Sequence, residues 1–301
     1  MAEKKFLIFR VRTSRLKAID LALKEVSVLF ADSGADFVIG GPLSQQKGII
    51  AASFPAETET AGLIAVFQRL GYVCAADEMI PCRQEKRDAF KWKGNYYFLE
   101  NIYSADEEEL RNQAPDKRTF LLPDADGNPH RVTGYRGDGS KTGRRALPVE
   151  DCKFMINLSG LKEGQKLLDP FAGAGGIVFF AVKNALKVYS SDVDEKMQYG
   201  LRDFGSKHFV ADIRKLPFEN DFFDAIVTEA PFDEEVTATV ADGLSEMKRV
   251  IKSKGAIVMM AASYQAEQIR QAAKASALMI NIDRPLNRKG TAVHIFKFLK
   301  E

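Results

Sequence analysis

The chain has 301 residues, more than one compact core usually holds, so we expect two domains. Hydrophobic residues make up 46% and charged residues 28%, a composition typical of a folded globular protein, which excludes a disordered one. The net charge of +2 neither requires nor excludes a nucleic-acid partner. Whether such a partner is expected therefore has to be judged from where basic residues cluster.

The sequence offers no sign of a membrane segment, a disulfide framework or a metal site. No apolar stretch approaches the length of a membrane span, and the apolar run at 6–9 is too short for the core of a signal peptide. We therefore expect a cytoplasmic protein without a membrane partner. The three cysteines (Cys74, Cys82 and Cys152) form no CxxC pair and the histidines are scattered, so we expect no metal.

The first eighty residues follow the order β-α-β-β-α-β. Strands are predicted at 5–11, 35–39, 48–54 and 72–76, and helices at 14–30 and 60–70, where apolar residues recur at helical spacing. This is the order of the split ferredoxin-like fold, so residues 1–80 are predicted to form an α+β ferredoxin-like domain. A fold of this kind carries no information on activity.

Residues 81–150 are predicted to form a connecting segment with partial structure. The aromatic stretch at 92–103 favours a strand or hairpin, residues 106–111 favour a short helix, and residues 124–129 have the composition of a turn. A glycine-rich, basic stretch follows at 135–145.

Residues 151–301 alternate between helix and strand. Strands are predicted at 166–169, 188–192, 208–212, 225–229 and 256–261, with helices at 154–161, 236–251 and 265–276. The segments 279–286 and 293–299 flank a turn and form a terminal hairpin. This α/β alternation predicts a parallel seven-stranded sheet with helices on both faces and a terminal antiparallel hairpin.

A glycine-rich turn follows the first strand of this region, in the run Asp-Pro-Phe-Ala-Gly-Ala-Gly-Gly from Asp169 to Gly176. Glycine lets the backbone approach a ligand closely, and open α/β sheets bind ligands at the carboxyl ends of their strands. The dinucleotide fingerprint fits poorly, because Val178 stands at its third small position. The Asp169 carboxylate would also repel an anionic pyrophosphate, whereas it suits the cationic sulfonium and ammonium groups of S-adenosylmethionine. A turn that uses glycine only for its geometry is the alternative.

Acidic residues also follow the next two strands. Asp192 lies 23 residues after Asp169, close to the spacing at which an acid binds ribose hydroxyls in nucleotide-binding sheets. Asp212 can accept a hydrogen bond from an adenine amino group while Ile213 packs on the ring, although Asp212 alone would be assigned to a turn or helix cap. Three acids at three successive strand ends favour an adenosine ligand.

Taken together, these motifs resemble class I S-adenosylmethionine-dependent methyltransferases. The similar stretches are Asp-Pro-Phe-Ala-Gly-Ala-Gly-Gly, Ser-Ser-Asp-Val-Asp, Ala-Asp-Ile, and Phe-Asp-Ala-Ile-Val-Thr-Glu-Ala-Pro-Phe, the last of which ends at Phe232. They are most similar to the tRNA guanosine N2-methyltransferases and their relatives, in which a ferredoxin-like and THUMP part precedes this domain. The resemblance covers residues 144–300, is only architectural for residues 1–80, and includes no recognisable THUMP sequence between them.

The resemblance implies a Rossmann-like class I methyltransferase domain with S-adenosyl-L-methionine as its cofactor. The residues expected to bind the cofactor are Asp169, Phe171, Gly173, Gly175, Asp192, Val193, Asp212 and Ile213.

The resemblance also implies an active site at the end of the fourth strand. Methyltransferases of exocyclic or amide nitrogens have an Asp or Asn, two prolines and an aromatic residue there. Carried over, Glu229 and the Ala230 carbonyl accept hydrogens from the target amine, Pro231 stiffens the loop, and Phe232 stacks on the substrate. Glu is longer than Asp and Ala replaces a proline, which leaves the target atom open. Glu229 could instead act as a general base, bind substrate or form a salt bridge.

Methyl transfer from a sulfonium is an in-line displacement that depends on positioning, and it requires neither a metal nor a covalent nucleophile. Cys152 could be considered as a nucleophile, as in the methylation of cytosine at C5. It precedes the first strand of the domain, however, and is not part of a Pro-Cys loop. It is predicted to be a buried helical residue.

The basic stretch suggests the substrate. Residues 130–145 contain the basic residues Arg131, Arg136, Lys141, Arg144 and Arg145 and the single acid Asp138, with Tyr135 available for stacking. This composition suits phosphate contact, although a solvated loop would look the same. With the resemblance it favours an RNA partner, a tRNA, with Arg136, Arg144 and Arg145 as substrate-binding residues.

The expected function is therefore methyl transfer to a nucleobase nitrogen in RNA, at a guanosine of tRNA. The ferredoxin-like domain would hold the RNA body while the Glu229 loop receives a flipped base. Two alternatives stay open: a methyltransferase for protein side chains or small molecules, and a non-catalytic cofactor-binding subunit. The amino-terminal domain could likewise contact a protein partner or a second subunit.

Overall fold

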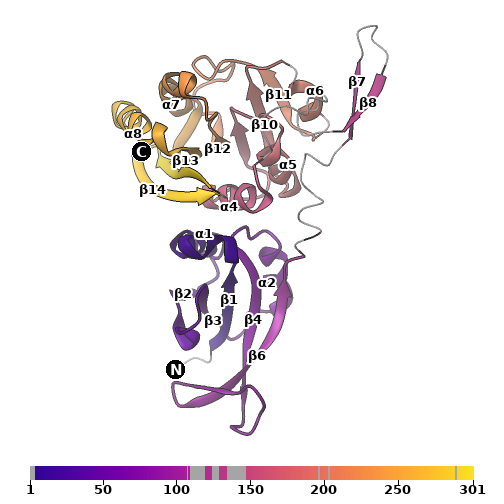
Figure 1. The fold of residues 1–301 in the computed structure, drawn as a ribbon, viewed down its shortest axis with the longest axis vertical. Coiled ribbons are helices and arrows are strands. Elements are labelled where there is room, and N and C mark those ends of the chain that lie inside the picture. The colour runs from indigo at the N-terminus through magenta and orange to yellow at the C-terminus, as the bar shows by residue number, and fades with distance from the viewer. Residues whose placement is uncertain are drawn as a thin grey trace. The chain divides into compact units, whose positions relative to one another are not determined.

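The computed structural model describes residues 4–106, 108, 119–123, 129–133, 147–195, 197–202, 204–288 and 290–301. The chain divides into two compact units, Met1–Leu110 and Arg111–Glu301 (Figure 1). In the described parts of the chain, no helix is long and apolar enough to cross a membrane.

The first unit is built on an antiparallel sheet of six strands in the order β2-β3-β1-β4-β6-β5. The strands are β1 (Lys4–Val11), β2 (Asp36–Ile39), β3 (Ile49–Pro55), β4 (Val73–Cys82), β5 (Phe90–Trp92) and β6 (Asn95–Ser104), and the helices are α1 (Ile19–Leu29) and α2 (Thr60–Phe67). The elements from β1 to β4 follow the β-α-β-β-α-β order that the sequence predicts. Buried aromatic rings of β1, β3 and α2 form the core together with Phe30, which directly follows α1, and Phe9 of β1 is among them.

The first unit extends beyond residue 80, the boundary predicted from the sequence. β4 runs to Cys82, and β6 pairs along it from Ala75 to Cys82, so the sheet includes much of the expected connecting segment. Pro81 does not end β4, because β4 pairs with β1 only as far as Glu78. Beyond Glu78 no strand in the described part of the chain pairs with that side of β4, and a missing backbone N–H is tolerated there.

The second unit is built on a seven-stranded sheet in the order β11-β10-β9-β12-β13-β15-β14. Its strands are β9 (Lys166–Asp169), β10 (Lys187–Asp192), β11 (Lys207–Val210), β12 (Phe223–Glu229), β13 (Ile251–Ala262), β14 (Met279–Arg288) and β15 (Thr291–Leu299). Its helices are α4 (Val149–Ser159), α5 (Gly176–Lys183), α6 (Met197–Arg202), α7 (Thr237–Val250) and α8 (Ala266–Ala275). β9 to β13 pair in parallel and β15 is antiparallel to both neighbours, so the predicted parallel sheet with a terminal hairpin is confirmed.

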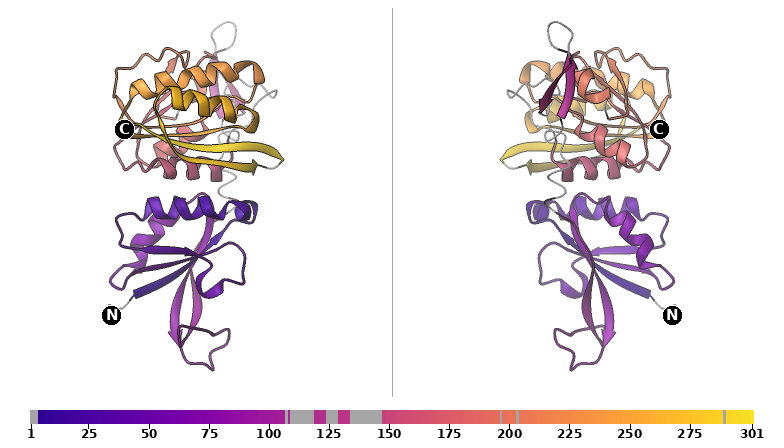
Figure 2. Two further views of the ribbon diagram at one scale, coloured as in Figure 1. Left: turned by 90° about the vertical axis from the view of Figure 1, so that its left-hand side faces the viewer. Right: turned by 90° about the vertical axis from the view of Figure 1, so that its right-hand side faces the viewer.

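Helices cover both faces of this sheet. α7 and α8 pack on one face and α4 lies on the other (Figure 2). The apolar core against α7 and α8 includes Leu168, Ile226, Met247 and Phe296, all fully buried. The chain runs outward from β9 through β10 to β11 and then returns to β12 on the other side of β9, so the strand order reverses between β9 and β12. Such a reversal is where open α/β sheets bind ligands.

A separate antiparallel pair, β7 (Thr119–Pro123) and β8 (Pro129–Thr133), precedes this sheet. The predicted helix at 106–111 and turn at 124–129 lie largely outside the described residues, and the basic stretch at 135–145 lies wholly outside them.

Candidate active site

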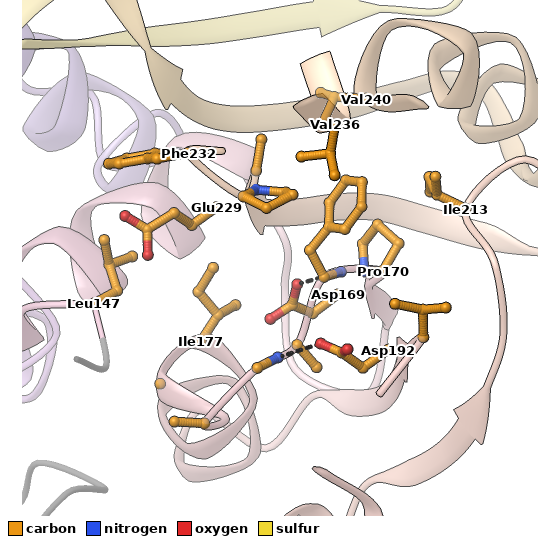
Figure 3. A pocket seen from close by; sticks show the side chains of 18 of the residues that line it. Leu147, Asp169, Pro170, Ile177, Asp192, Ile213, Glu229, Phe232, Val236 and Val240 are labelled. Carbon is orange, nitrogen blue, oxygen red and sulfur yellow. Dashed lines mark hydrogen bonds between the residues drawn. The ribbon is translucent and has the colours of Figure 1, made fainter. Parts of the chain in front are cut away.

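A cavity of about 770 Å³ lies at the strand-order reversal (Figure 3). It is lined by residues that follow β9, β10, β11 and β12, because parallel strands bring their carboxyl ends to one edge of the sheet. The volume is in the range of small-molecule and cofactor sites, on the order of 300–1,000 Å³. Of the residues expected at the cofactor and catalytic sites, all but Gly175 line this cavity.

Asp169, the last residue of β9, is a buried carboxylate. It is 1% exposed, and its Oδ1 accepts a hydrogen bond from the Thr228 hydroxyl at 2.7 Å and from the Phe171 N–H at 3.4 Å. Burial raises the pKa of Asp169 to about 7, the two hydrogen bonds oppose the rise, and the carboxylates of Asp192 and Glu229 add to it. Among the described residues no basic side chain forms an ion pair with Asp169, so a cationic ligand would supply the missing charge.

Gly173 and Gly175 have different tasks in the turn. Gly173 has a φ of +47°, its N–H donates to Asp192 Oδ2 at 2.9 Å, and an added Cβ would meet only the Phe171 carbonyl at 4.0 Å. Gly175, which we expected to bind cofactor, does not line the cavity. Its φ is +80°, and a Cβ there would lie 2.5 Å from the Phe204 ring and 2.8 Å from Leu201. Gly175 is therefore required for packing beneath the turn.

Asp192 ends β10 with its carboxylate held in place. Oδ1 accepts from the Asp194 N–H at 3.0 Å, while Oδ2 accepts from Gly173. The neighbouring Val193 lines the cavity and is 74% exposed, so its apolar side chain is accessible to a ligand. Together they offer a fixed acceptor and an apolar surface, which suit a ribose and an adjoining flat ring.

Asp212 and Ile213 follow β11. Asp212 forms a bidentate pair with Arg214, whose Nη2 and Nε donate at 2.6 and 3.0 Å. These hydrogen bonds lower the pKa of Asp212, so it remains an ionised acceptor. Ile213 is buried against Gly243 of α7, where an added Cβ would lie 2.5 Å from Ile213 Cγ1. Gly243 thus lets Ile213 lie under the cavity.

The loop 229–232 is anchored to β13 and to the 3₁₀ turn Ser263–Gln265 that follows it. The Ala230 N–H donates to the Met260 carbonyl at 2.8 Å. The buried Gln265 donates a hydrogen bond through Nε2 to the Pro231 carbonyl at 2.9 Å. The Tyr264 hydroxyl donates another to the Phe232 carbonyl. The backbone of the expected catalytic loop is therefore held by one backbone group and two side chains from outside it.

Arg288 lines the same cavity, and no motif in the sequence had singled it out. Its Nη1 donates to Glu229 Oε1 in an ion pair, and its guanidinium carbon lies 5.3 Å from the centroid of the Phe232 ring. A salt bridge was one of the alternatives open for Glu229. The sequence indicates only a hairpin turn around Arg288. In the structure β14 runs parallel to β12 and β13, so its last residue, Arg288, reaches the same edge of the sheet.

Two other predictions concern Cys152 and the expected substrate-binding arginines. Cys152 is fully buried in α4, its thiol lies 3.4 Å from the Leu147 carbonyl, and burial raises its pKa, so it is a core residue as predicted. Arg136, Arg144 and Arg145 lie outside the described residues.

The charge of the cavity fits S-adenosylmethionine. The described lining residues include the acids Asp169, Asp192, Asp212, Glu229 and Asp233, and Arg288 is the one basic residue among them. A site with this excess of carboxylates suits a ligand that carries sulfonium and ammonium charges. The buried Asp169 and the close approach allowed by Gly173 point the same way.

The fold and this site define a class I methyltransferase. Residues 168–259 match the family model described as a methyltransferase domain. The carboxyl-terminal unit is therefore a class I S-adenosylmethionine-dependent methyltransferase domain, and S-adenosyl-L-methionine is its cofactor.

Particular relatives are tRNA methylases. The chain is 37% identical over 147 residues to the tRNA (guanine(10)-N2)-dimethyltransferase of Methanothermobacter thermautotrophicus. The matched region covers 46% of this chain and 37% of that protein. It is 33% identical over 125 residues to the enzyme of the same name from Pyrococcus abyssi, which covers 36% of this chain and 37% of that protein. The matched region thus spans less than two-fifths of these relatives. The domain is related in sequence to the tRNA guanine-N2 group, as the resemblance implied.

Among solved structures, TrmN is similar over nearly the whole chain. The crystal structure of TrmN from Thermus thermophilus has a TM-score of 0.54 and covers 99% of this chain and 100% of that one, at 15% identity. The two proteins therefore share a fold over their full lengths.

Proposed function

We propose that the chain transfers a methyl group from S-adenosyl-L-methionine to a nucleobase nitrogen in RNA, and that its substrate is a guanosine of tRNA. The observation that carries the proposal is the pairing, beside the cofactor cavity, of an acceptor carboxylate with an aromatic ring, Glu229 and Phe232. The choice of guanosine is supported by the relatives, both of which are named tRNA (guanine(10)-N2)-dimethyltransferases.

The residues around the turn would hold the cofactor, which supplies an activated methyl group. Asp169 would face its positive charge, Asp192 would accept from the ribose hydroxyls, and Asp212 would accept from the adenine amino group. Phe171, Val193 and Ile213 would pack on the apolar parts, and Gly173 would let them approach the backbone. Gly175 would act only through packing.

The loop 229–232 would position the target amine. A carboxylate that accepts a hydrogen bond from the amine directs the nitrogen lone pair away from itself, towards the methyl group. Glu229 and the Ala230 carbonyl take that task, and Glu229 is then also the base that receives the proton which the methylated amine loses. Pro231 stiffens the loop, and Phe232 stacks on a base flipped out of the RNA.

The first unit would bind the body of the RNA as a ferredoxin-like domain extended by β5 and β6. The strand order β2-β3-β1-β4, with α1 and α2 between them, supports this assignment. On the β4–β6 segment, lysine ammonium groups lie over aromatic rings, in the pairs Lys86–Phe98, Lys91–Tyr96 and Lys93–Trp92. Basic and aromatic side chains together suit the backbone and bases of RNA. Arg136, Arg144 and Arg145 would add phosphate contacts, and a tRNA substrate would place the protein in the cytoplasm.

The test is transfer of tritium from labelled S-adenosylmethionine to RNA, DNA, protein and metabolites extracted from cells that lack this protein. We expect label that RNase removes and that maps to a guanosine in tRNA. Label in protein or in small molecules would replace the RNA proposal. The absence of label, with cofactor binding intact, would instead make the chain a non-catalytic subunit. Glu229→Gln should bind cofactor normally and transfer label much more slowly than the wild type, at a rate that can still be measured.

A further inference from the structure

We propose that Arg288 is a positioning residue for methyl transfer: one guanidinium group fixes both the Glu229 carboxylate and the Phe232 ring. This inference rests on the proposed function, because it concerns how the acceptor and the stacking ring are aligned when the target base enters.

Arg288 contacts the loop 229–232 from β14, an outermost strand of the sheet. Arg288 is the last residue of β14, and its Nη1 contacts both Glu229 Oε1 and, at 3.4 Å, the sulfur of Met260 on β13. Its guanidinium carbon lies over the Phe232 ring. The Arg288 side chain is 17% exposed and that of Glu229 is 22% exposed, so water screens their attraction less than at a surface. The pair therefore sets the orientation of both catalytic-loop side chains.

The departures of this loop from the family pattern make such support necessary. Glu229 has one more rotatable bond than the Asp or Asn of related loops, so more side-chain freedom has to be lost to hold its carboxylate still. Ala230 replaces a proline, which leaves the backbone before Pro231 less constrained. Arg288 restrains the carboxylate, as Gln265 restrains the Pro231 carbonyl.

The acids Asp169 and Glu229 of the cavity differ in whether a basic side chain balances their charge. The charged and titratable groups around Glu229 include Arg288 of β14, Asp169 of β9 and Cys152 of α4. Asp169 has no basic partner among the described residues, which suits a cationic cofactor, whereas Glu229 is balanced by Arg288. The balanced end suits an uncharged planar group such as a nucleobase. A lysine side chain, being cationic, would be repelled by Arg288.

The test compares Arg288→Gln and Arg288→Lys with Arg284→Gln, a matched change on the same strand at a residue that does not line the cavity. Misplacing a catalytic group can cost on the order of a hundredfold in rate, so Arg288→Gln should lower kcat by about tenfold to a hundredfold. Its KM for RNA and its cofactor affinity should change by less than about threefold, since Arg288 acts on alignment. Arg288→Lys should recover part of the loss, and Arg284→Gln should behave as wild type.

Two further readouts separate positioning from other roles. In the Glu229→Gln background, Arg288→Gln should add little, because residues that act as a unit are not additive. Carbon-13 NMR of the Glu229 carboxyl in the full chain, assigned by its loss in Glu229→Gln, should show titration at a higher pH in Arg288→Gln than in wild type. The acidic limb of the kcat profile should move the same way.

Several results would overturn the proposal. The first is an unchanged kcat and pH profile in Arg288→Gln. The second is a rise in KM for RNA alone, with the titration of Glu229 unchanged. The third is a loss of kcat in the Glu229→Gln background as large as the loss in the wild-type background. If wild-type protein labels no RNA, the proposed function fails instead, and the NMR titration still decides whether Arg288 controls Glu229. Melting curves identify a variant that fails to fold, in which case Arg288→Lys carries the test.

Discussion

The Thr228 hydroxyl donates a hydrogen bond of 2.7 Å to the buried Asp169 carboxylate, and the two residues lie at the carboxyl ends of the neighbouring strands β12 and β9. This bond and the Phe171 N–H stabilise the ionised form, yet burial outweighs them and raises the pKa of Asp169 to about 7. The carboxylate that faces the cofactor cavity therefore changes its charge close to neutral pH.

Cofactor affinity should consequently depend on pH. A cationic ligand binds the ionised form of Asp169, so affinity should fall as pH drops through 7, on the order of tenfold between pH 7.5 and 6.0. Isothermal titration calorimetry of S-adenosylmethionine binding measures this. Asp169→Asn, which keeps an acceptor for Thr228, should bind weakly and with a flatter profile. A flat profile in the wild type would remove Asp169 from the cofactor site.

The same carboxyl should lower the stability of the ligand-free protein at alkaline pH. Its pKa is about 7 when folded against a normal value of 3.8, so the folded state binds the proton more tightly than the unfolded chain. The contribution of Asp169 to stability is thus most favourable below pH 3.8 and is lost as pH rises through 7. Asp169→Asn should be more stable than wild type at pH 8, by a few kcal/mol at most (about 1.4 kcal/mol per pKa unit), and the gain should shrink towards pH 5. Urea unfolding at both pH values checks the sign, and a gain that grows on acidification would contradict it.

Alanine at the two glycines of the turn should separate stability from binding. Gly175→Ala has to fit a Cβ 2.5 Å from Phe204 at a φ of +80°, so it should lower the free energy of unfolding by about 2 kcal/mol or more. Gly173→Ala meets no close atom of the described residues, and its left-handed backbone should cost only about 1 kcal/mol. Gly173 lines the cavity, however, so an added methyl group there changes the cavity wall. It should therefore weaken cofactor binding more than Gly175→Ala does. Thermal melts and calorimetry on both variants decide, and the reverse ranking would refute the division of tasks.

The lysines of the β5–β6 hairpin should contribute to RNA affinity. The double variant Lys91→Gln, Lys93→Gln should weaken tRNA binding. It should also lower the salt slope, which is the change in the logarithm of affinity with the logarithm of salt concentration. The expected decrease is roughly 0.7–0.9 for each phosphate that the variant no longer neutralises. Lys24→Gln with Lys47→Gln, at exposed positions elsewhere in the first unit, is the matched control. Equal slopes in both double variants and the wild type would exclude the hairpin from the RNA surface.

Local patterns were enough to predict most of the second unit and its cavity. Strand periodicity and the glycine-rich turn located β9 and β12, and parallel strands bring their carboxyl ends together, so Asp169, Asp192 and Glu229 were expected near one another. The cavity wall contributed by Arg288 could not be derived in this way. Its surroundings in the sequence indicate only a hairpin turn, and its partner lies 59 residues away.

The remaining differences have a similar cause, since they depend on which neighbours an element acquires. The composition of residues 81–104 does not say whether they pair with β4, and pairing alone made them part of the first sheet. Gly175 belongs to the same motif as Gly173, but the contact that requires it is with Phe204, 29 residues further on.

The position of Arg288 in the last hairpin has a consequence for biosynthesis. β15 lies between β13 and β14 in the sheet, although it is the last of the three to leave the ribosome. Until it is inserted, β14 has no strand to pair with and Arg288 is not brought to Glu229. A nascent chain can thus contain every cofactor-facing residue while its substrate end is incomplete, and the ability to methylate should be acquired only after β15 has been synthesised.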